Sequence, residues 1–288
     1  MPRNCAFLTL EDRTGFSIYD HLLFEPLAKL DWLVEEIPWN RHNIEWSRFD
    51  AVVIRSTWDY QITPDKFLST LEEIESVTKL YNPVDICRWN LNKRYLRDLQ
   101  SKGIQIIPTY WLEGLSKHSI ESVFQASATK RLVAKPLIGA NANDTFVLTL
   151  ENPASWNGAI SVFADREVML QPFIDSIQVE GEYSLFYFGG HFSHAVVKRP
   201  AEGDYRVQEE HGGIIASVNP DQDLIRAGAQ AIKAIEKTLL YARVDLVKLE
   251  SGQPALIEME LIEPSLYFEH CPNSAEMFAA QFDRIAGC

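Results

Sequence analysis

The feature that most constrains this fold is the stretch 241–263, which reads YARVDLVKLESGQPALIEMELIE. Two apolar runs flank the turn-rich segment 251–254, and this pattern predicts an antiparallel β-hairpin. With the turn centred on its Ser-Gly pair, Asp245 lies opposite Glu258. Because side chains alternate along a strand and cross-strand partners share a face, Asp245, Glu258 and Glu260 are expected to converge.

Three carboxylates on a largely apolar face are costly unless a cation neutralises their charge. Oxygen ligands without a paired His or Cys favour Mg²⁺ over zinc. The alternative is an amphipathic hairpin whose acidic face is simply solvated. On the residue pattern alone, a magnesium site formed by Asp245, Glu258 and Glu260 is the favoured interpretation.

The composition is that of a soluble globular chain, long enough for more than one subdomain. Of the 288 residues, 46% are hydrophobic and 23% are charged. No apolar run approaches the roughly 20 residues of a membrane helix, and the first residues do not resemble a signal peptide. A net charge of −13 argues against a nucleic-acid partner, since phosphate-backbone affinity needs a basic surface. We therefore expect a cytoplasmic protein with no membrane and no nucleic acid as partner.

The first 80 or so residues alternate short apolar strands with helical segments, which predicts a small open α/β sheet. The segment RSTWDY directly follows the buried-type strand 51–54, and ligands of such sheets bind beyond the carboxyl ends of strands. Its Arg is expected to hold a substrate carboxylate and its Asp an amine, beside aromatic walls. The alternative, of equal weight, is a turn with a local Arg–Asp pair and a buried Trp. The substrate-binding candidates are Arg55, Ser56, Trp58, Asp59 and Tyr60.

Two lysines, Lys93 and Lys135, lie in segments of different kinds. Lys93 lies on a predicted helix over 87–100, which by itself indicates only a solvated side chain. Lys135 ends a predicted strand, and the loop 136–144 with Gly139 follows it. Such a loop can turn backbone N–H groups toward phosphate, although the P-loop and Rossmann glycine patterns are absent from the sequence.

The remaining chain is read as further strands and helices around one long loop. In the strand 168–174, Pro172 interrupts the backbone ladder and frees groups for a flat ligand edge such as adenine; a simple domain crossing is the commoner meaning. The polar loop 200–213 contains Arg206 and His211 and is long enough to be functional or disordered. The other predicted elements are a strand over 104–108, a helix over 116–125, a strand over 145–150, a hairpin over 181–188 and 191–199, and helices over 221–241 and 274–286.

The order of these signals resembles the ATP-grasp superfamily from about residue 82 to residue 264. The segments that carry the resemblance are NPVDICRWNLNKRYLRDLQSKGIQIIPT, LVAKPLIGANAND, QPFI, GEYSLFYF, KRPAEGDYRVQEEHGG, ARVDLV and IEMELIEPSL. Within the superfamily the chain is similar to the branch of glutathione synthetase and ribosomal-protein glutamate ligase. The RSTWDY and LIEMELIEPSLYF segments are most similar to a subgroup that includes D-cycloserine synthetase.

The resemblance implies an α/β architecture of α+β subdomains, with an ATP-grasp fold behind an N-terminal open α/β domain. Residues 1–81 would form that N-terminal, substrate-contributing domain. Residues 82–106 and 171–288 would form the ATP-grasp subdomain with the metal site, and residues 107–170 would form a lid.

The resemblance also assigns roles to single residues. ATP would be bound through its phosphates, ribose and adenine by Lys93, Lys135, Gly139, Glu182, Gln171, Pro172, Phe173 and Ile174. One or two Mg²⁺ ions would be held by Asp245, Glu258 and Glu260. The catalytic cations that neutralise the transferring phosphoryl group and the acyl phosphate would be Lys198 and Arg206. His211 joins the candidates for substrate binding.

The implied activity is ATP-dependent, ADP-forming ligation of a small amino-acid-like carboxylate to an amine through an acyl phosphate. Ring closure within one molecule is one form of this reaction, and a homodimer is a common state of such enzymes. The alternatives are a regulatory ATP-binding protein without turnover and a kinase-like enzyme that releases a phosphorylated product. Two departures stand out: family members often have Asn where Glu260 stands, and Ala140 and Ala142 make the phosphate loop poorer in glycine.

Overall fold

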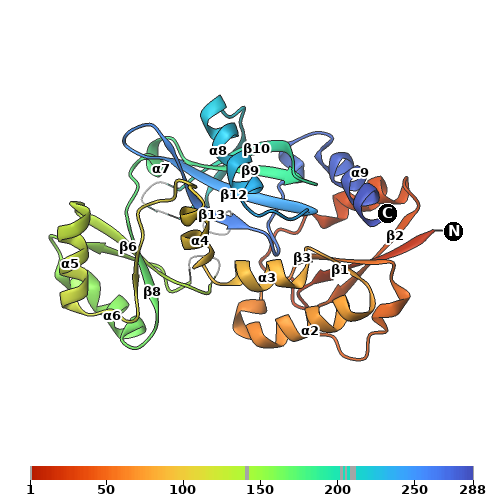
Figure 1. Cartoon of the computed structure of the whole chain (residues 1–288), viewed down its shortest axis with the longest axis horizontal. Helices are drawn as coiled ribbons and strands as arrows, with labels where there is room; N and C mark the ends of the chain where they lie inside the picture. Colours follow the sequence, from red (N-terminus) through yellow and green to blue (C-terminus); the bar gives the residue numbers. More distant parts are fainter. Residues whose placement is uncertain (1, 140–142, 202–203, 205, 208–211, 288) are drawn as a thin grey trace.

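The computed structural model describes residues 2–139, 143–201, 204, 206–207 and 212–287, and their strands form three sheets (Figure 1). The sheets fall in the segments 3–81, 110–172 and 182–260. This mixed α/β arrangement confirms the predicted fold class. The exact domain boundaries stay a prediction. None of the helices in the described residues is long and apolar enough to cross a bilayer.

The N-terminal sheet is a parallel four-stranded sheet in the order β2-β1-β3-β4. Its strands are β1 (Arg3–Thr9), β2 (Trp32–Pro38), β3 (Ala51–Ser56) and β4 (Lys79–Tyr81). The central strand β3 is buried along its whole length, as its apolar sequence predicts. The connections contain η1 (Asp20–Leu23), α1 (Phe24–Ala28), η2 (Trp46–Arg48), η3 (Tyr60–Ile62) and α2 (Pro64–Val77). The predicted open α/β sheet is therefore confirmed, with β4 as an additional short strand.

The largest sheet has five antiparallel strands in the order β11-β10-β9-β12-β13. They are β9 (Glu182–Phe188), β10 (His191–Arg199), β11 (Ile214–Ser217), β12 (Tyr241–Lys248) and β13 (Pro254–Glu260). The hairpin β12–β13 pairs Asp245 with Glu258, which is the register that the turn position predicts. A β-bulge interrupts the ladder just after Asp245. The helices of this region are α7 (Ser176–Val179), α8 (Gln222–Lys233), η6 (Phe268–His270) and α9 (Ser274–Ala286).

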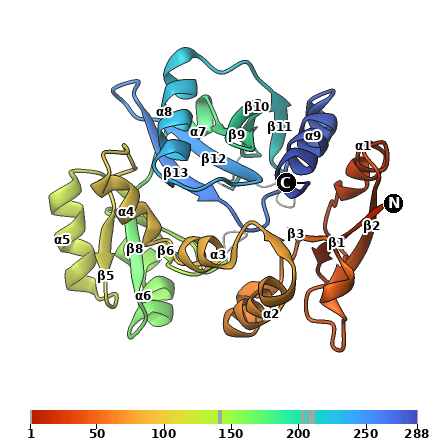
Figure 2. The ribbon, with the colours of Figure 1, turned by 45° about the vertical axis from the view of Figure 1, so that its right-hand side comes forward.

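Helix α9 joins the five-stranded sheet to the N-terminal sheet. Figure 2 shows it between the two, beside α1 and near the C-terminus. Its apolar face contributes Phe278 and Phe282 to a core cluster that also contains Phe7, Trp32 and Phe188. The rings of Trp32 and Phe282 are 4.6 Å apart. Because the two sheets share this core, the N-terminal sheet is fixed relative to the hairpin.

The third sheet is antiparallel, in the order β5-β8-β6-β7, and stands apart from the N-terminal sheet (Figure 1). Its strands are β5 (Tyr110–Leu112), β6 (Arg131–Pro136), β7 (Phe146–Thr149) and β8 (Val168–Pro172), with helices α5 (Lys117–Ser127), η4 (Pro153–Trp156) and α6 (Asn157–Phe163). Helix α5 begins at a capping box between Ser116 and Ser119. The sheet buries its own apolar cluster, which includes Phe124, Trp156 and Phe163.

Three predicted elements differ from the structure. The single helix over 87–100 is two helices, α3 (Val84–Leu91) and α4 (Tyr95–Ser101). The helix breaks because the Asn92 side chain accepts from the Arg94 N–H at 3.0 Å, while the Lys93 N–H donates to the Leu137 carbonyl at 2.8 Å. The strand over 104–108 is reduced to one bridge, between Ile106 and Leu256. The helix over 221–241 ends at Lys233 instead, and its last predicted residue, Tyr241, is the first residue of β12.

The buried side chain of Asn82 ties the N-terminal region to the hairpin. Its Nδ2 donates to the carbonyls of Tyr241 at 2.9 Å and Leu261 at 2.7 Å, and its Oδ1 accepts from the Leu240 N–H at 2.8 Å. Replacing Asn82 by Ala is expected to lower the free energy of unfolding by about 2–4 kcal/mol, because three buried backbone groups lose their partner. Urea denaturation measures this loss. The same change at the exposed Asn157 is the control and should shift stability by less than about 0.5 kcal/mol.

Candidate active site

A cavity of about 240 Å³ is lined by residues of the five-stranded sheet, of the third sheet and of the segments that follow β1 and β3 of the N-terminal sheet. Its wall contains groups from segments that are far apart in the sequence, including the predicted phosphate-binding lysines and the predicted metal ligands. The charged members of this wall include Lys93, Lys135, Lys198, Asp245, Glu258 and Glu260. The structure therefore brings together most of the residues that the sequence singled out.

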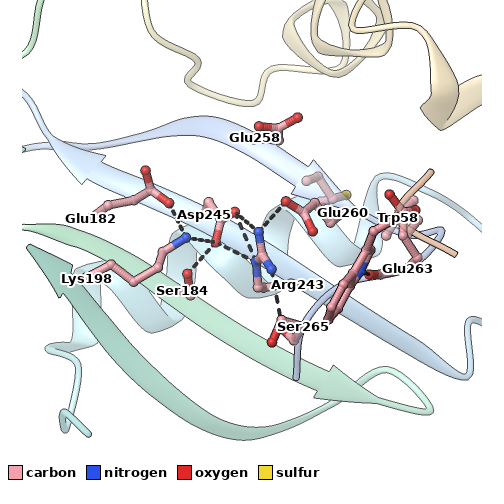
Figure 3. A network of polar contacts seen from close by, with 12 residues as sticks. Trp58, Glu182, Ser184, Lys198, Arg243, Asp245, Glu258, Glu260, Glu263 and Ser265 are labelled. Carbon is pink, nitrogen blue, oxygen red and sulfur yellow. Dashed lines mark hydrogen bonds and ion pairs between the residues drawn. The ribbon is translucent and has the colours of Figure 1, made fainter. Parts of the chain in front are cut away.

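Each predicted metal ligand already has a cation beside it. Lys93 forms an ion pair with Glu258 and also donates to the Gly139 carbonyl at 3.2 Å. Arg243 donates to both carboxylate oxygens of Asp245, at 3.0–3.1 Å, and also to Glu260. Figure 3 shows Arg243 between these two carboxylates, on the cavity face of the hairpin. These contacts neutralise much of the charge of the acidic cluster.

A second buried ion pair extends this network toward β10. Lys198 pairs with Glu182 across the β9–β10 ladder, and its Nζ is 3.5 Å from Asp245 Oδ1 (Figure 3). The hydroxyl of Ser184 donates to the same Asp245 oxygen. Asp245 is only 2% exposed, so it is the buried centre of the network.

Burial and charge act in opposite directions on these groups. Burial alone would raise the pKa of Asp245, but Arg243 and Lys198 hold it below its ordinary value. Glu258 behaves in the same way, because Lys93 lowers its pKa against the effect of burial. For Glu260 burial prevails over Arg243, and the charges of Asp245 and Glu258 add to it, so its pKa rises to about 7. The cluster therefore has two carboxylates that stay ionised and one that titrates near neutrality.

Lys135 differs from the other cavity lysines because it has no carboxylate partner within ion-pair distance among the described residues. Burial lowers the pKa of its ammonium below the ordinary value. Its position at the end of β6 points it into the cavity wall near Lys93. A half-buried cation with no carboxylate partner among the described residues is a candidate for anion binding.

The predicted hinge lies at an apolar end of the cavity. Gln171, Pro172, Phe173 and Ile174 all line the wall, and Ile107 and Ile257 join them. The Gln171 side chain donates to Thr109 at 3.0 Å, and the Phe173 N–H donates to the Arg131 carbonyl at 3.0 Å. An apolar slot beside charged groups suits a flat base attached to phosphates.

The carboxylates of Asp245, Glu258 and Glu260 are of the chemical type that binds a divalent cation, but they are not arranged around a common metal position. All three donors are oxygens, which Mg²⁺ prefers. Within the described residues, however, no group of three or more His, Cys, Asp or Glu side chains is placed to hold a metal ion. Glu258 pairs with Lys93 and Glu260 pairs with Arg243. Both carboxylates are therefore directed toward protein cations rather than toward a shared metal position.

The segment after β3 contributes less to the cavity than expected. Arg55 is 2% exposed, and its guanidinium donates to Asp20 at 2.9 Å and to the Pro264 carbonyl at 3.4 Å. Asp59 accepts from the Trp39 indole at 2.6 Å. Neither residue lines the cavity, nor does the buried Ser56. Their predicted contacts with substrate are therefore not supported by this geometry; the buried Arg–Asp pair is close to the alternative interpretation, with Asp20 as the partner.

Other predicted residues of this site fall into two groups. Trp58 and Tyr60 do line the cavity, and so does Arg206, whose guanidinium makes a two-point contact with Asp204 at 2.8–3.2 Å. His211, Ala140 and Ala142 lie outside the described residues.

Two charged residues of the wall, Arg243 and Glu263, were not predicted from the sequence. Arg243 is two residues before Asp245 on one strand, so the alternation that identified the acidic face also places it there. Glu263 follows β13, where no strand pattern applies. Its backbone carbonyl accepts from the Trp58 indole at 2.8 Å, a contact across 205 residues that only the tertiary fold reveals.

Comparison with known proteins agrees with this geometry. Residues 5–82 match the family described as the N-terminal domain of D-cycloserine synthetase DcsG. The chain is 32% identical, over 269 residues, to the cycloserine biosynthesis protein DcsG of Streptomyces lavendulae, covering 89% of this chain and 90% of that protein. The crystal structure of D-cycloserine synthetase DcsG superposes with a TM-score of 0.86 at 30% identity, covering 98% of this chain and 99% of the other.

More distant structures share the fold alone. The ATP-grasp ligase PsnB, in a complex with minimal precursor, Mg and ADP, has a TM-score of 0.64 at 14% identity, covering 97% and 98% of the two chains. D-alanine–D-alanine ligase from Bacillus anthracis, complexed with ATP, has a TM-score of 0.69 at 16% identity, covering 100% and 96%.

The fold and the cavity thus define an ATP-dependent ligase of the ATP-grasp class. Within that class, the chain belongs to the family of the cycloserine biosynthesis protein DcsG.

Proposed function

We propose that this protein is an ADP-forming carboxylate–amine ligase that activates a small amino-acid-like substrate as an acyl phosphate. The observation that carries the proposal is that Lys135, which has no ion-pair partner in the part of the chain that the structure describes, lines one cavity with the acidic hairpin and an apolar slot. Family membership favours ring closure within one molecule as the form of the reaction. A cytoplasmic location and a homodimer stay predictions from the sequence.

In this proposal, ATP lies with its base in the apolar slot and its phosphates near Lys93 and Lys135. Asp245, Glu258 and Glu260 are the residues that would hold Mg²⁺, which supplies positive charge to the phosphates when bound. A phosphate competes with Glu258 for the ammonium of Lys93, so nucleotide binding frees that carboxylate.

The chemistry then follows from positioning and charge. A substrate carboxylate oxygen attacks the γ-phosphorus, the bond to ADP breaks, and an acyl phosphate forms. The amine attacks the acyl carbon, a C–N bond forms, and phosphate leaves while the amine loses a proton. Lys198 and Arg206, on the cavity wall, are the cations proposed to neutralise the phosphoryl group in transfer. Burial works against the charge of Lys198, but Asp245 and Glu182 raise its pKa, so it stays protonated.

The direct test is a coupled assay for ADP release over a panel of amino acids and their analogues. The proposal predicts Mg²⁺-dependent ADP and phosphate formation with at least one substrate, and a product that mass spectrometry identifies as an amide or a closed ring. Protein that binds ATP but releases no ADP with any substrate would contradict it. A stable phosphorylated substrate would identify a kinase-like enzyme instead.

Replacing Lys135 by Ala is expected to weaken ATP binding about 10–100-fold, because a charge-assisted contact to phosphate is lost. Equilibrium titration with a non-hydrolysable ATP analogue measures this. Lys130 is the matched control: it precedes the same strand, but its side chain is 81% exposed and paired with Glu151, so Lys130→Ala should leave affinity unchanged. Equal effects of the two changes would remove Lys135 from the phosphate site.

A further inference from the structure

Aromatic rings line one part of the cavity wall. They come from other segments of the chain than the predicted phosphate-binding lysines. Phe16, Trp58 and Tyr60 contribute to the wall, together with Glu263. The rings of Phe16 and Trp58 are 5.4 Å apart at an angle of 50°. The indole N–H of Trp58 donates to the Glu263 carbonyl, and Figure 3 shows the indole beside that residue. The aromatic wall is therefore fixed to the segment that carries the Glu263 carboxyl group.

Glu263 is the one acidic residue of the described cavity wall without an ion pair. Glu182, Asp245, Glu258 and Glu260 each pair with Lys93, Lys198 or Arg243. Glu263 instead lies near the hydroxyl of Tyr60. Burial and the nearby charge of Glu260 raise its pKa to about 8. Among the described residues, no cation lies within ion-pair distance of this carboxyl group, whereas each of the other acids of the wall has one there.

We propose that Glu263, Trp58 and Phe16 form a subsite that binds the protonated amino group of an amino-acid-like substrate. A primary ammonium group supplies the missing counterion for the carboxylate. It also interacts favourably with aromatic faces, whose negative potential attracts cations. A hydroxy acid or an unsubstituted acid of the same size supplies neither contact. The subsite rests on the proposed function and specifies its substrate class: small acids with a free amine.

The position of the subsite fits this class of substrate. Glu263 is three residues beyond Glu260, and the Arg243 guanidinium, which donates to Glu260, also lines the cavity. An amino group held at Glu263 leaves the substrate carboxyl group close to the cations of the network, where phosphorylation is proposed. The sequence had assigned the amine to Asp59, but that carboxylate is held by Trp39 away from the cavity. Glu263 takes over that role on the same side of the cavity as Trp58 and Tyr60.

Two matched ligand pairs test the subsite by calorimetry at neutral pH, with and without Mg²⁺ and a non-hydrolysable ATP analogue. The pairs are D-alanine with D-lactate, and D-cycloserine with isoxazolidin-3-one, which is the same ring without the amino group. The wild-type protein is expected to bind the amino member of at least one pair more than about tenfold tighter than its partner. In Glu263→Gln this preference should fall to about twofold or less, with the affinity for the partner unchanged.

The controls separate recognition from structure. Glu263→Asp keeps the charge and should recover part of the preference, whereas Glu250→Gln changes an exposed residue of the hairpin turn and should retain all of it. A merely structural role for Glu263 would weaken both members of a pair equally. The subsite is refuted if the preference survives in Glu263→Gln, or if neither amino member binds the wild-type protein more tightly than its partner. Because these titrations need no turnover, they are independent of the ADP-release assay that tests the ligase activity.

Discussion

Replacing Glu258 by Gln or Asp245 by Asn is expected to lower Mg²⁺-dependent ADP formation on the order of 100-fold or more. Each change keeps the shape of the side chain and removes one negative charge from the acidic face of the hairpin. The two residues are direct cross-strand partners that line the cavity, so each would lose contact with the cation that accompanies ATP. ADP release at saturating ATP measures the effect.

The fold should survive both changes. Without the Asp245 charge, Lys198 keeps Glu182 and Arg243 keeps Glu260 as partners. Circular dichroism and thermal unfolding check this, and Glu250→Gln in the turn of the same hairpin is the matched control for activity. Turnover that stays at the wild-type level in both variants would show that the hairpin does not hold the metal.

The second large effect is expected for Arg243→Met. Arg243 is 7% exposed and pairs with both Asp245 and Glu260, so its loss leaves Asp245 with Lys198 alone and Glu260 with no ion-pair partner among the described residues. Breaking such a pair costs about 3–5 kcal/mol. Urea denaturation at neutral pH measures the loss, and Arg226→Met on the exposed face of α8 should cost less than about 1 kcal/mol.

The same change has a pH dependence of known sign. Arg243 lowers the pKa of Asp245 in the folded protein. This ion pair therefore stabilises the wild type fully at pH values above the pKa of Asp245 in the unfolded chain. The stabilisation is lost as the pH falls through the lower pKa of Asp245 in the folded protein. In Arg243→Met the folded pKa values of Asp245 and Glu260 rise. Their protonated forms need no counterion, so the gap between variant and wild type should narrow as the pH is lowered. A gap that is independent of pH would mean that Arg243 stabilises by packing alone.

The sequence predicts the parts of this site that depend on contacts within the hairpin. The pairing of Asp245 with Glu258 requires only a turn position and strand alternation, and the structure has that register. The same alternation contains Arg243, although the residue pattern does not say that a guanidinium would occupy the space between two carboxylates. Turn position and strand alternation therefore identify the residues on the hairpin face, but not the ion pairs that these residues form.

Long-range contacts decide the features that the sequence did not predict. The helix break at Lys93 depends on a backbone bond to Leu137, which lies beyond the third sheet's strand β6. Arg55 pairs with Asp20, which lies in the connection between β1 and β2, rather than with Asp59, which is nearer in the sequence. Both features depend on contacts that form only when distant parts of the chain pack together, so no local sequence pattern predicts them.

The most direct test of the whole account is a crystal structure with Mg²⁺ and a non-hydrolysable ATP analogue. The account predicts the base against Phe173 and Ile174, the phosphates between Lys93 and Lys135, and the cation on Asp245, Glu258 and Glu260. A nucleotide bound elsewhere, or a cavity that stays empty at saturating analogue, would contradict it.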